Sequence, residues 1–302
     1  MSKIAGVMHY IENGKLRAAV STWGAVLESL YDISKSRELL WQLDKTGEFK
    51  QFPLTFPIVN MIANNEYTYK GKRYHMEIHG FAHKSEFTVS EKTATSIALT
   101  LVSNDATRQE YPFDFELTIR YTLDGGALQK EYIVTNKSGD DMFYNAGGHE
   151  GYRLAVLDGE KMDDYYLVFG ETVDLTAYRY SAISSIRSGE TYEFIPEPGR
   201  RLYLSMENLY RDSLSFNNMS GKFVELYGPN TGFHARVRFG DFNALGLWTQ
   251  AGPPDTNYIC IEPHMVLPDS ELDSTELTEK TRYRRLAPGQ TEALSYFIDT
   301  TA

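Results

Sequence analysis

The chain has 302 residues, with 30 Lys and Arg against 41 Asp and Glu, which gives a formal net charge of -11. This acidic balance argues against nucleic-acid binding, which needs a cationic surface. No stretch reaches the roughly 18 to 20 apolar residues of a membrane-spanning helix, and a hydrophobic fraction of 42% is enough for a large globular core.

Cysteine usage and the first residues indicate the compartment. Cys260 is the single cysteine, which excludes an internal disulfide, and residues 1–7 lack the apolar core of a signal peptide. We therefore expect a cytoplasmic protein, either a monomer or a homodimer.

Alternation of apolar and polar residues predicts β-strands along most of the chain. Three antiparallel hairpins are expected, because paired alternating runs flank turn residues. In chain order these runs are residues 67–69 with 73–75 around Lys70-Gly71, residues 113–121 with 128–136 around Asp124-Gly125-Gly126, and residues 223–227 with 234–239 around residues 228–232. Helix signals are weak, and residues 34–40 and 205–211 are the best short candidates. The pattern predicts an all-β fold, a large two-sheet antiparallel sandwich that forms a single domain over residues 1–302.

Histidine and cysteine patterns give little support for a metal site. His75, His79 and His83 are spaced by four, which would align them on a helix. The segment follows a predicted hairpin and contains Gly80, so we expect the three rings to be scattered and no metal to be bound. Cys260 lies in the apolar run 258–261, which predicts a buried, inert thiol.

Two carboxylates are candidates for chemistry. Glu262 follows that apolar run and precedes Pro263, so it lies where a rigid strand meets a loop, a common position for a catalytic group. Asp212 is the second. For both residues, a solvated carboxylate at a strand end or in a loop is the competing interpretation.

An ordered set of short motifs resembles the aldose 1-epimerase (galactose mutarotase) family over most of the chain. The motifs are Phe56-Pro57-Ile58-Val59-Asn60, His79-Gly80-Phe81-Ala82, Asn145-Ala146-Gly147-Gly148-His149, and Leu247-Trp248 leading to Cys260-Ile261-Glu262-Pro263. The resemblance implies a β-supersandwich with a sugar pocket and the interconversion of the α and β anomers of a free aldose.

The resemblance also implies roles for individual residues. Glu262 matches the general base and His149 the general acid, while His79 and Asp212 match residues that bind the sugar. We add Asn60, Tyr152 and Trp248 as candidate sugar contacts, because they lie in or beside the motifs. A carboxylate and an imidazole supply the acid and base that ring opening needs, so no cofactor is expected. The expected partner is a small-molecule sugar.

Four positions depart from the family pattern. Met61 replaces a frequent Arg, His83 another Arg, Glu150 a Pro and His264 a Trp. Met61 removes a bidentate donor to sugar oxygens, and Asn60, Asn64, His83 and Arg153 are candidates to replace it.

Two other functions remain open. A noncatalytic sugar-binding protein would keep the pocket and lose the chemistry. A glycoside hydrolase would use Asp212 and Glu262 as a pair, with the two carboxyl groups about 5 to 10 Å apart.

Overall fold

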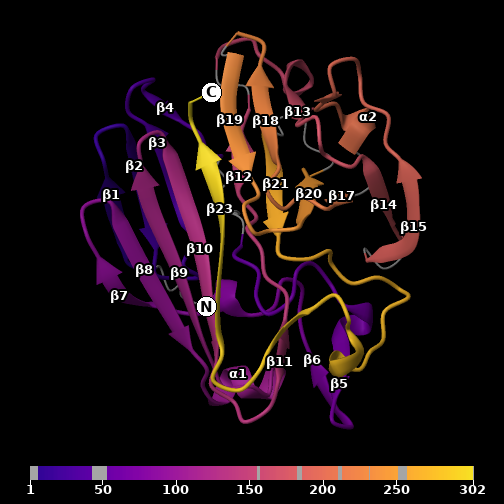
Figure 1. Cartoon of the computed structure of the whole chain (residues 1–302). Coiled ribbons are helices and arrows are strands. Elements are labelled where there is room, and N and C mark those ends of the chain that lie inside the picture. Colours follow the sequence, from indigo (N-terminus) through magenta and orange to yellow (C-terminus); the bar gives the residue numbers. More distant parts are fainter. Residues whose placement is uncertain are drawn as a thin grey trace.

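The protein is built almost entirely from antiparallel β-sheets, as the sequence predicts (Figure 1). The computed structural model describes residues 6–42, 53–154, 157–181, 186–209, 213–230, 232–250 and 257–301. The largest sheet has nine strands. Their order across the sheet is β16 (Arg201–Tyr203), β13 (Tyr166–Phe169), β18 (Phe223–Gly228), β19 (Gly232–Arg238), β23 (Thr291–Asp299), β10 (Ala127–Asn136), β9 (Phe115–Asp124), β8 (Ser96–Val102) and β7 (Thr88–Lys92).

Two further sheets make up the second layer. One has the order β12 (Gly151–Arg153), β21 (Tyr258–His264), β20 (Ala244–Trp248), β17 (Leu214–Asn217), β14 (Thr176–Tyr180) and β15 (Arg187–Glu193). The other is β1 (Met8–Glu12), β2 (Leu16–Ser21), β3 (Leu27–Asp32) and β4 (Arg37–Glu38). The Trp41 amide donates to the Gly151 carbonyl at 2.8 Å and the Arg153 amide to the Leu39 carbonyl at 2.9 Å. These hydrogen bonds join the two sheets edge to edge.

The remaining elements are short. They are the two-stranded sheets β5 (Glu66–Tyr69) with β6 (Lys72–His75) and β11 (Met142–Tyr144) with β22 (Arg284–Leu286), the helices α1 (Asp105–Glu110) and α2 (Met206–Leu209), and the 3-10 turns η1 (Ala63–Asn65), η2 (Ala82–Lys84), η3 (Met162–Asp164) and η4 (Leu277–Glu279). Among the helices of the described ranges, none has the length and apolarity needed to cross a membrane.

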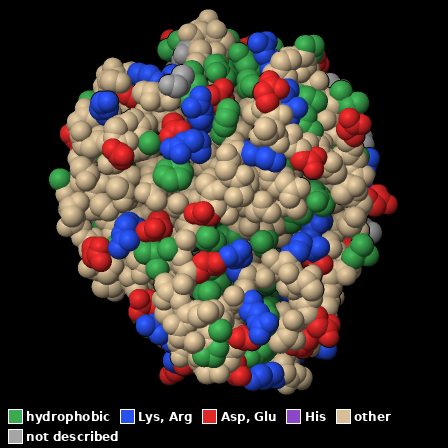
Figure 2. Space-filling model, in the orientation of Figure 1, with side chains coloured by type: hydrophobic (Ala, Val, Ile, Leu, Met, Phe, Trp, Pro, Cys, Tyr) green, Lys and Arg blue, Asp and Glu red, His purple; other side chains and the backbone are tan. Residues whose placement is uncertain are grey.

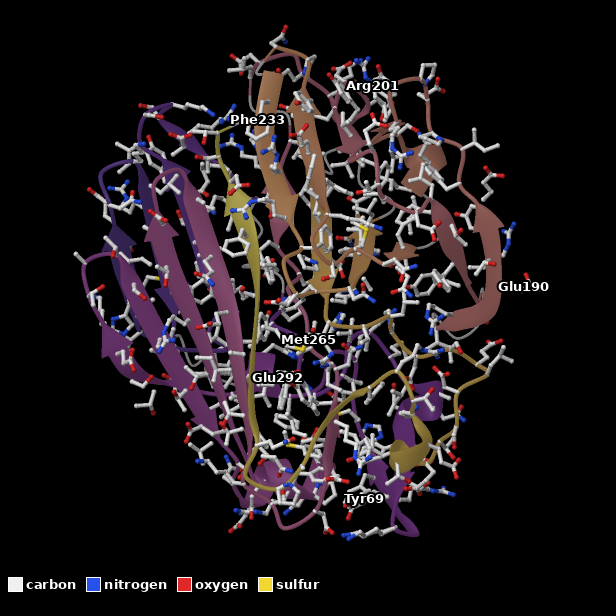
Figure 3. All side chains as sticks on the ribbon, viewed as in Figure 1. Tyr69, Glu190, Arg201, Phe233, Met265 and Glu292 are labelled. Carbon is white, nitrogen blue, oxygen red and sulfur yellow. The ribbon has the colours of Figure 1, made fainter. Side chains whose placement is uncertain are left out.

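The core lies between the layers. Strand β9 buries every second side chain from Phe115 to Leu123, the alternation that its sequence predicts. Tyr121 on this strand donates its hydroxyl to the Ala25 carbonyl of the other layer at 2.7 Å. Met265, just after β21, lies near the centre of the molecule (Figure 3) and is 2% exposed. On the face seen in Figure 2, acidic and basic side chains are interspersed.

The three predicted hairpins are confirmed. They are the pairs β5–β6, β9–β10 and β18–β19, each antiparallel. The strands of these three hairpins therefore lie where local periodicity and turn residues predict them.

The helix predicted at residues 34–40 is wrong. This segment forms a turn and strand β4, with Ser36 at a φ of +50°. The Glu38 carboxylate accepts the amides of Leu30 at 2.9 Å and Leu40 at 3.0 Å, so its hydrogen bonds favour the hairpin over a helix. The second predicted helix, at residues 205–211, contains α2, and its last two residues, 210 and 211, lie outside the described residues.

Helix α1 was not predicted. It has six residues, too few for a periodic apolar stripe, and Asn104 caps it by accepting the amides of Ala106 and Thr107.

Candidate active site

Strand β21 carries the central group of the site. Every residue from Tyr258 to His264 is buried, and the two-residue period of a strand puts Cys260, Glu262 and His264 on one face. Gly246 on β20 lies opposite Glu262 in the register. A Cβ at that position would lie 2.8 Å from Cε1 of His264 and 3.2 Å from Oε2 of Glu262, so the absence of a side chain leaves room for these two groups.

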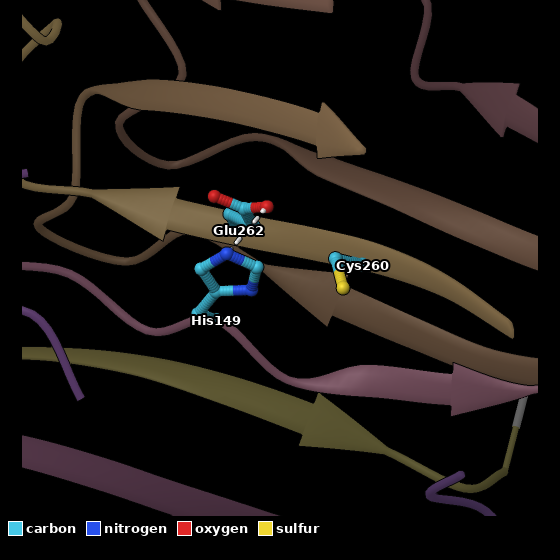
Figure 4. A group of neighbouring side chains, drawn as sticks. All are labelled: His149, Cys260 and Glu262. Atoms are coloured by element: carbon cyan, nitrogen blue, oxygen red, sulfur yellow. Dashed lines mark ion pairs between the residues drawn. The ribbon is translucent and has the colours of Figure 1, made fainter. Parts of the chain in front are cut away.

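Each oxygen of Glu262 faces a histidine. The Oε1 atom lies 3.4 Å from Nε2 of His149, and Oε2 lies 3.1 Å from Nε2 of His264 (Figure 4 shows the first contact). Burial raises the pKa of Glu262, but the charge of His149 and the hydrogen bond from His264 outweigh it, so the pKa lies below the usual value of 4.5. The side chain is therefore a buried carboxylate near neutral pH, able to accept a proton.

His149 is held by a backbone segment that runs beside β21. Gly148 donates its amide to the Pro263 carbonyl at 2.9 Å, and the Ile261 amide donates to the Glu150 carbonyl at 3.2 Å. These bonds hold the main chain on either side of His149 beside β21. Burial lowers the pKa of His149, and Glu262 opposes the shift without reversing it.

His79 comes from a tight turn in which its own φ is +61° and that of Gly80 is +72°. A Cβ at residue 80 would lie 2.3 Å from the Phe56 carbonyl oxygen, so this turn requires glycine. The Asn60 amide donates to Nδ1 of His79 at 3.1 Å. Burial holds the pKa of His79 well below 6.5, so the ring is neutral with its proton on Nε2. His79 is thus a hydrogen-bond donor at Nε2.

These side chains share one cavity of about 390 Å³. Its described lining consists of Pro53, Asn60, Met61, Ile78, His79, His149, Tyr180, Ser213, Gly246, Trp248, Glu262, His264 and Pro268. The volume is in the range of small-molecule sites, and the mix of apolar walls with a few polar groups is typical of them.

Two aromatic residues contribute to the walls. The ring of Trp248 meets that of His149 nearly edge-on, with centroids 5.9 Å apart. The Tyr180 hydroxyl hydrogen-bonds to Ser215 at 2.6 Å, and burial raises the pKa of Tyr180 to about 12, so this residue is a neutral phenol.

Of the residues chosen from the sequence, Glu262, His149, His79, Asn60 and Trp248 meet at the cavity. Tyr152 does not, because its side chain is fully buried in the core and is absent from the described lining. Asp212 lies outside the described residues.

The histidine stripe does not form. As expected, the three rings are scattered: His75 is exposed on β6, His83 belongs to η2, and only His79 is part of the described lining. Of the four candidates to replace the missing arginine, Asn60 alone is in that lining.

Glu150 points away from the cavity despite its place next to His149. Its carboxylate accepts a hydrogen bond from Lys130 at 2.7 Å and from the Tyr296 hydroxyl at 2.7 and 2.8 Å, all inside the core. The replacement of the family's Pro by Glu150 therefore changes the core packing next to His149 and leaves the lining of the cavity unaffected.

One group of side chains has ligand types that suit a metal ion. Within the described ranges, ligand atoms of His149, Cys260 and Glu262 lie within 4.8 Å of one another (Figure 4). A metal-bound cysteine must be a thiolate, whereas burial, Glu262 and Glu150 raise the pKa of Cys260 well above its usual value. Both Glu262 oxygens also face histidines, so the group fits proton transfer better than metal binding.

Two residues of the site were missed by sequence reasoning. His264 was noted only as a replacement for Trp, although its two-residue spacing from Glu262 on a strand places both on one face. Tyr180 gave no local signal, because β14 reaches the cavity only through the sheet order β21-β20-β17-β14.

The chain is similar to known proteins over most of its length. The family model described as aldose 1-epimerase matches residues 8–270. The plasmid-encoded protein LacX of Lactococcus lactis subsp. lactis is 27% identical over 294 residues, covering 95% of this chain and 97% of LacX.

Two crystal structures have the same fold over nearly the full chain. A galactose mutarotase related enzyme from Lactobacillus acidophilus has a TM-score of 0.87 at 30% identity and covers 98% of both chains. A galactose mutarotase-like protein from Lactobacillus casei has a TM-score of 0.86 at 26% identity, covering 97% of this chain and 99% of the other. The chain belongs to the aldose 1-epimerase family and has the galactose mutarotase-like fold.

Proposed function

We propose that this protein interconverts the α and β anomers of a free aldose by opening and closing the sugar ring. The observation that carries the proposal is the contact between Glu262 and His149, a buried carboxylate and an imidazole 3.4 Å apart on the wall of a sugar-sized cavity. Ring opening needs one group that accepts a proton and one that donates it, and this pair supplies both.

In the proposed reaction, Glu262 takes the proton of the C1 hydroxyl while His149 gives a proton to the ring oxygen. The bond between C1 and the ring oxygen breaks and C1 becomes an aldehyde. After rotation about the C1–C2 bond, the hydroxyl formed from the ring oxygen attacks the other face of the aldehyde carbonyl. It gives its proton back to His149, and Glu262 returns the other proton to the oxygen on C1.

The other lining residues have supporting roles in this proposal. His79, neutral and with its proton on Nε2, donates a hydrogen bond to the ring oxygen. Asn60 holds His79 in that tautomer through its backbone amide. The ring of Trp248 offers an apolar face to the C–H side of the sugar.

The test is the rate at which freshly dissolved α-D-glucose and α-D-galactose reach anomeric equilibrium, followed by polarimetry. We expect the wild type to accelerate this rate. Glu262→Gln should reduce the acceleration by a factor of about 10² or more, which is the contribution typical of one general acid or base. The matched control is Glu190→Gln, the same change at a glutamate that is exposed on β15 (Figure 3) and distant in the sheet from Glu262. It should keep wild-type activity.

Calorimetry beside this assay separates catalysis from sugar binding alone. Sugar binding by calorimetry without any acceleration would identify a noncatalytic binding protein on this fold. Full activity in Glu262→Gln would exclude Glu262 as the base.

A further inference from the structure

His264 is held in one orientation by two glycines. A Cβ at Gly147 would lie 2.7 Å from Cδ2 of the imidazole, and a Cβ at Gly246 would lie 2.8 Å from its Cε1. Neither glycine has a positive φ, so the backbone conformation does not require glycine at either position. The space they leave is occupied by the ring of His264 and, at Gly147, also by the Pro263 carbonyl oxygen, 2.8 Å from the Cβ position.

The space between Gly147 and Gly246 orients the imidazole of His264 so that its Nε2 edge faces the carboxylate of Glu262. Nε2 of His264 lies 3.1 Å from Oε2 of Glu262, and both side chains are buried. A carboxylate only accepts hydrogen bonds, so Nε2 carries the proton and donates it. A Cβ at Gly246 would also lie 3.2 Å from Oε2, so the same glycine makes room for both partners.

We propose that His264 is a positioning residue, clamped between Gly147 and Gly246, that holds Oε2 of Glu262 and so leaves Oε1 beside His149 for proton transfer. The inference rests on the proposed function for its kinetic consequence only. The geometric consequence, a carboxylate fixed by two histidines, is independent of the reaction catalysed.

The hydrogen bond has a second effect on the base. Donation to Oε2 favours the ionised carboxylate over the protonated form, so His264 helps to keep Glu262 ready to accept a proton. The other titratable groups that interact with Glu262 are His149 from the segment before β12, Tyr180 from β14 and Cys260 on the same strand. Each remains in place when His264 is replaced.

The first experiment titrates Glu262 directly, without substrate. Carbon-13 NMR of protein labelled at the glutamate carboxyl carbon follows every glutamate, and the Glu262→Gln spectrum assigns the signal. We expect the midpoint to rise by about one pH unit or more in His264→Leu. His264→Gln, whose amide still donates, should shift it less, and Gly246→Ala, which displaces the ring, should shift it in the same direction.

The second experiment measures anomerisation against pH. In His264→Leu, kcat should fall about tenfold with little change in KM, and the acid limb of kcat/KM should move to higher pH with the Glu262 midpoint. His234→Leu is the matched control, because His234 is an equally buried histidine on β19 in the other layer. It should leave both readouts unchanged at neutral pH.

The two failures are distinguishable. If His264→Leu and His264→Gln leave the Glu262 midpoint at the wild-type value, His264 only fills space and the inference is refuted. If the wild type shows no anomerisation but the midpoint moves as expected, the proposed function fails and the positioning role of His264 is retained.

Discussion

Replacement of Lys130 by Met should destabilise the protein strongly, because it leaves a buried carboxylate without its cation. Lys130 lies on β10 and Glu150 beside β12, so their ion pair crosses the interior between the two layers. The two atoms Nζ and Oε1 are 2.7 Å apart, and the side chains are only 3% and 5% exposed. Nζ also lies 5.4 to 5.8 Å from the ring centres of Tyr121, Tyr132 and Tyr296.

The magnitude follows from this burial. Removal of one partner from a buried pair typically costs about 3 to 5 kcal/mol of unfolding free energy. With an unfolding entropy of about 2.1 cal/mol/K per residue, each kcal/mol lowers the Tm of a chain of this length by about 1.6 °C. We therefore expect Lys130→Met to lower Tm by about 5 to 8 °C at pH 7.

Thermal unfolding followed by circular dichroism measures this shift. Lys137→Met is the matched control, since Lys137 is 53% exposed and its ion pair is long at 4.0 Å; it should move Tm by less than about 1 °C. The double variant Lys130→Met with Glu150→Gln should recover more than half of the loss, because Tyr296 can still donate to the amide oxygen. A Tm for Lys130→Met within about 1.5 °C of the wild type would contradict this expectation, because it would mean that the buried pair contributes less than about 1 kcal/mol.

Three further predictions concern pH and substrate affinity. Burial lowers the pKa of His149 below 6.5, so its protonated fraction falls as pH rises from 6 to 8 and kcat/KM should fall with it; a flat profile would mean that a neutral imidazole is the donor. Burial lowers the pKa of His234 to about 3, so only the unfolded state gains a proton as pH falls from 6.5 towards 3. This should cost about 2 kcal/mol of stability by pH 5, and urea unfolding of His234→Leu should show that this part of the pH dependence is gone. Trp248→Ala should raise the KM for the sugar about fivefold with a smaller effect on kcat, because a ring face is worth about 1 kcal/mol; an unchanged KM would exclude Trp248 as a sugar contact.

Local patterns in the sequence account for most of the strands. The alternation in residues 113–121 corresponds to the alternating buried and half-buried side chains of β9, and Asp124-Gly125-Gly126 forms the turn to β10. The failures were short elements. The segment around Ser36 formed a hairpin instead of a helix, and α1 was missed. Hydrogen bonds to the side chains of Glu38 and Asn104 stabilise these two elements, and such bonds give no periodic pattern in the sequence.

The site was predictable only in part. The order of the motifs indicated Glu262, His149 and His79 through a family resemblance, and all three line one cavity. Tyr152 was wrongly expected there. A residue beside a motif on a strand has even odds of facing either side of the sheet, and Tyr152 faces the core.

Local sequence sets which side chains share a face within a strand, since a strand repeats every two residues. The extension of β21 through Pro263 to His264, which puts Cys260, Glu262 and His264 on one face, was not foreseen. The tertiary structure alone decided which distant segments meet that face. It brought His149 against Oε1 of Glu262, placed Tyr180 in the lining of the same cavity and turned Glu150 into the core toward Lys130. The physical reason is that these contacts depend on the order of strands in the sheets and on the packing of two layers, which local periodicity does not encode.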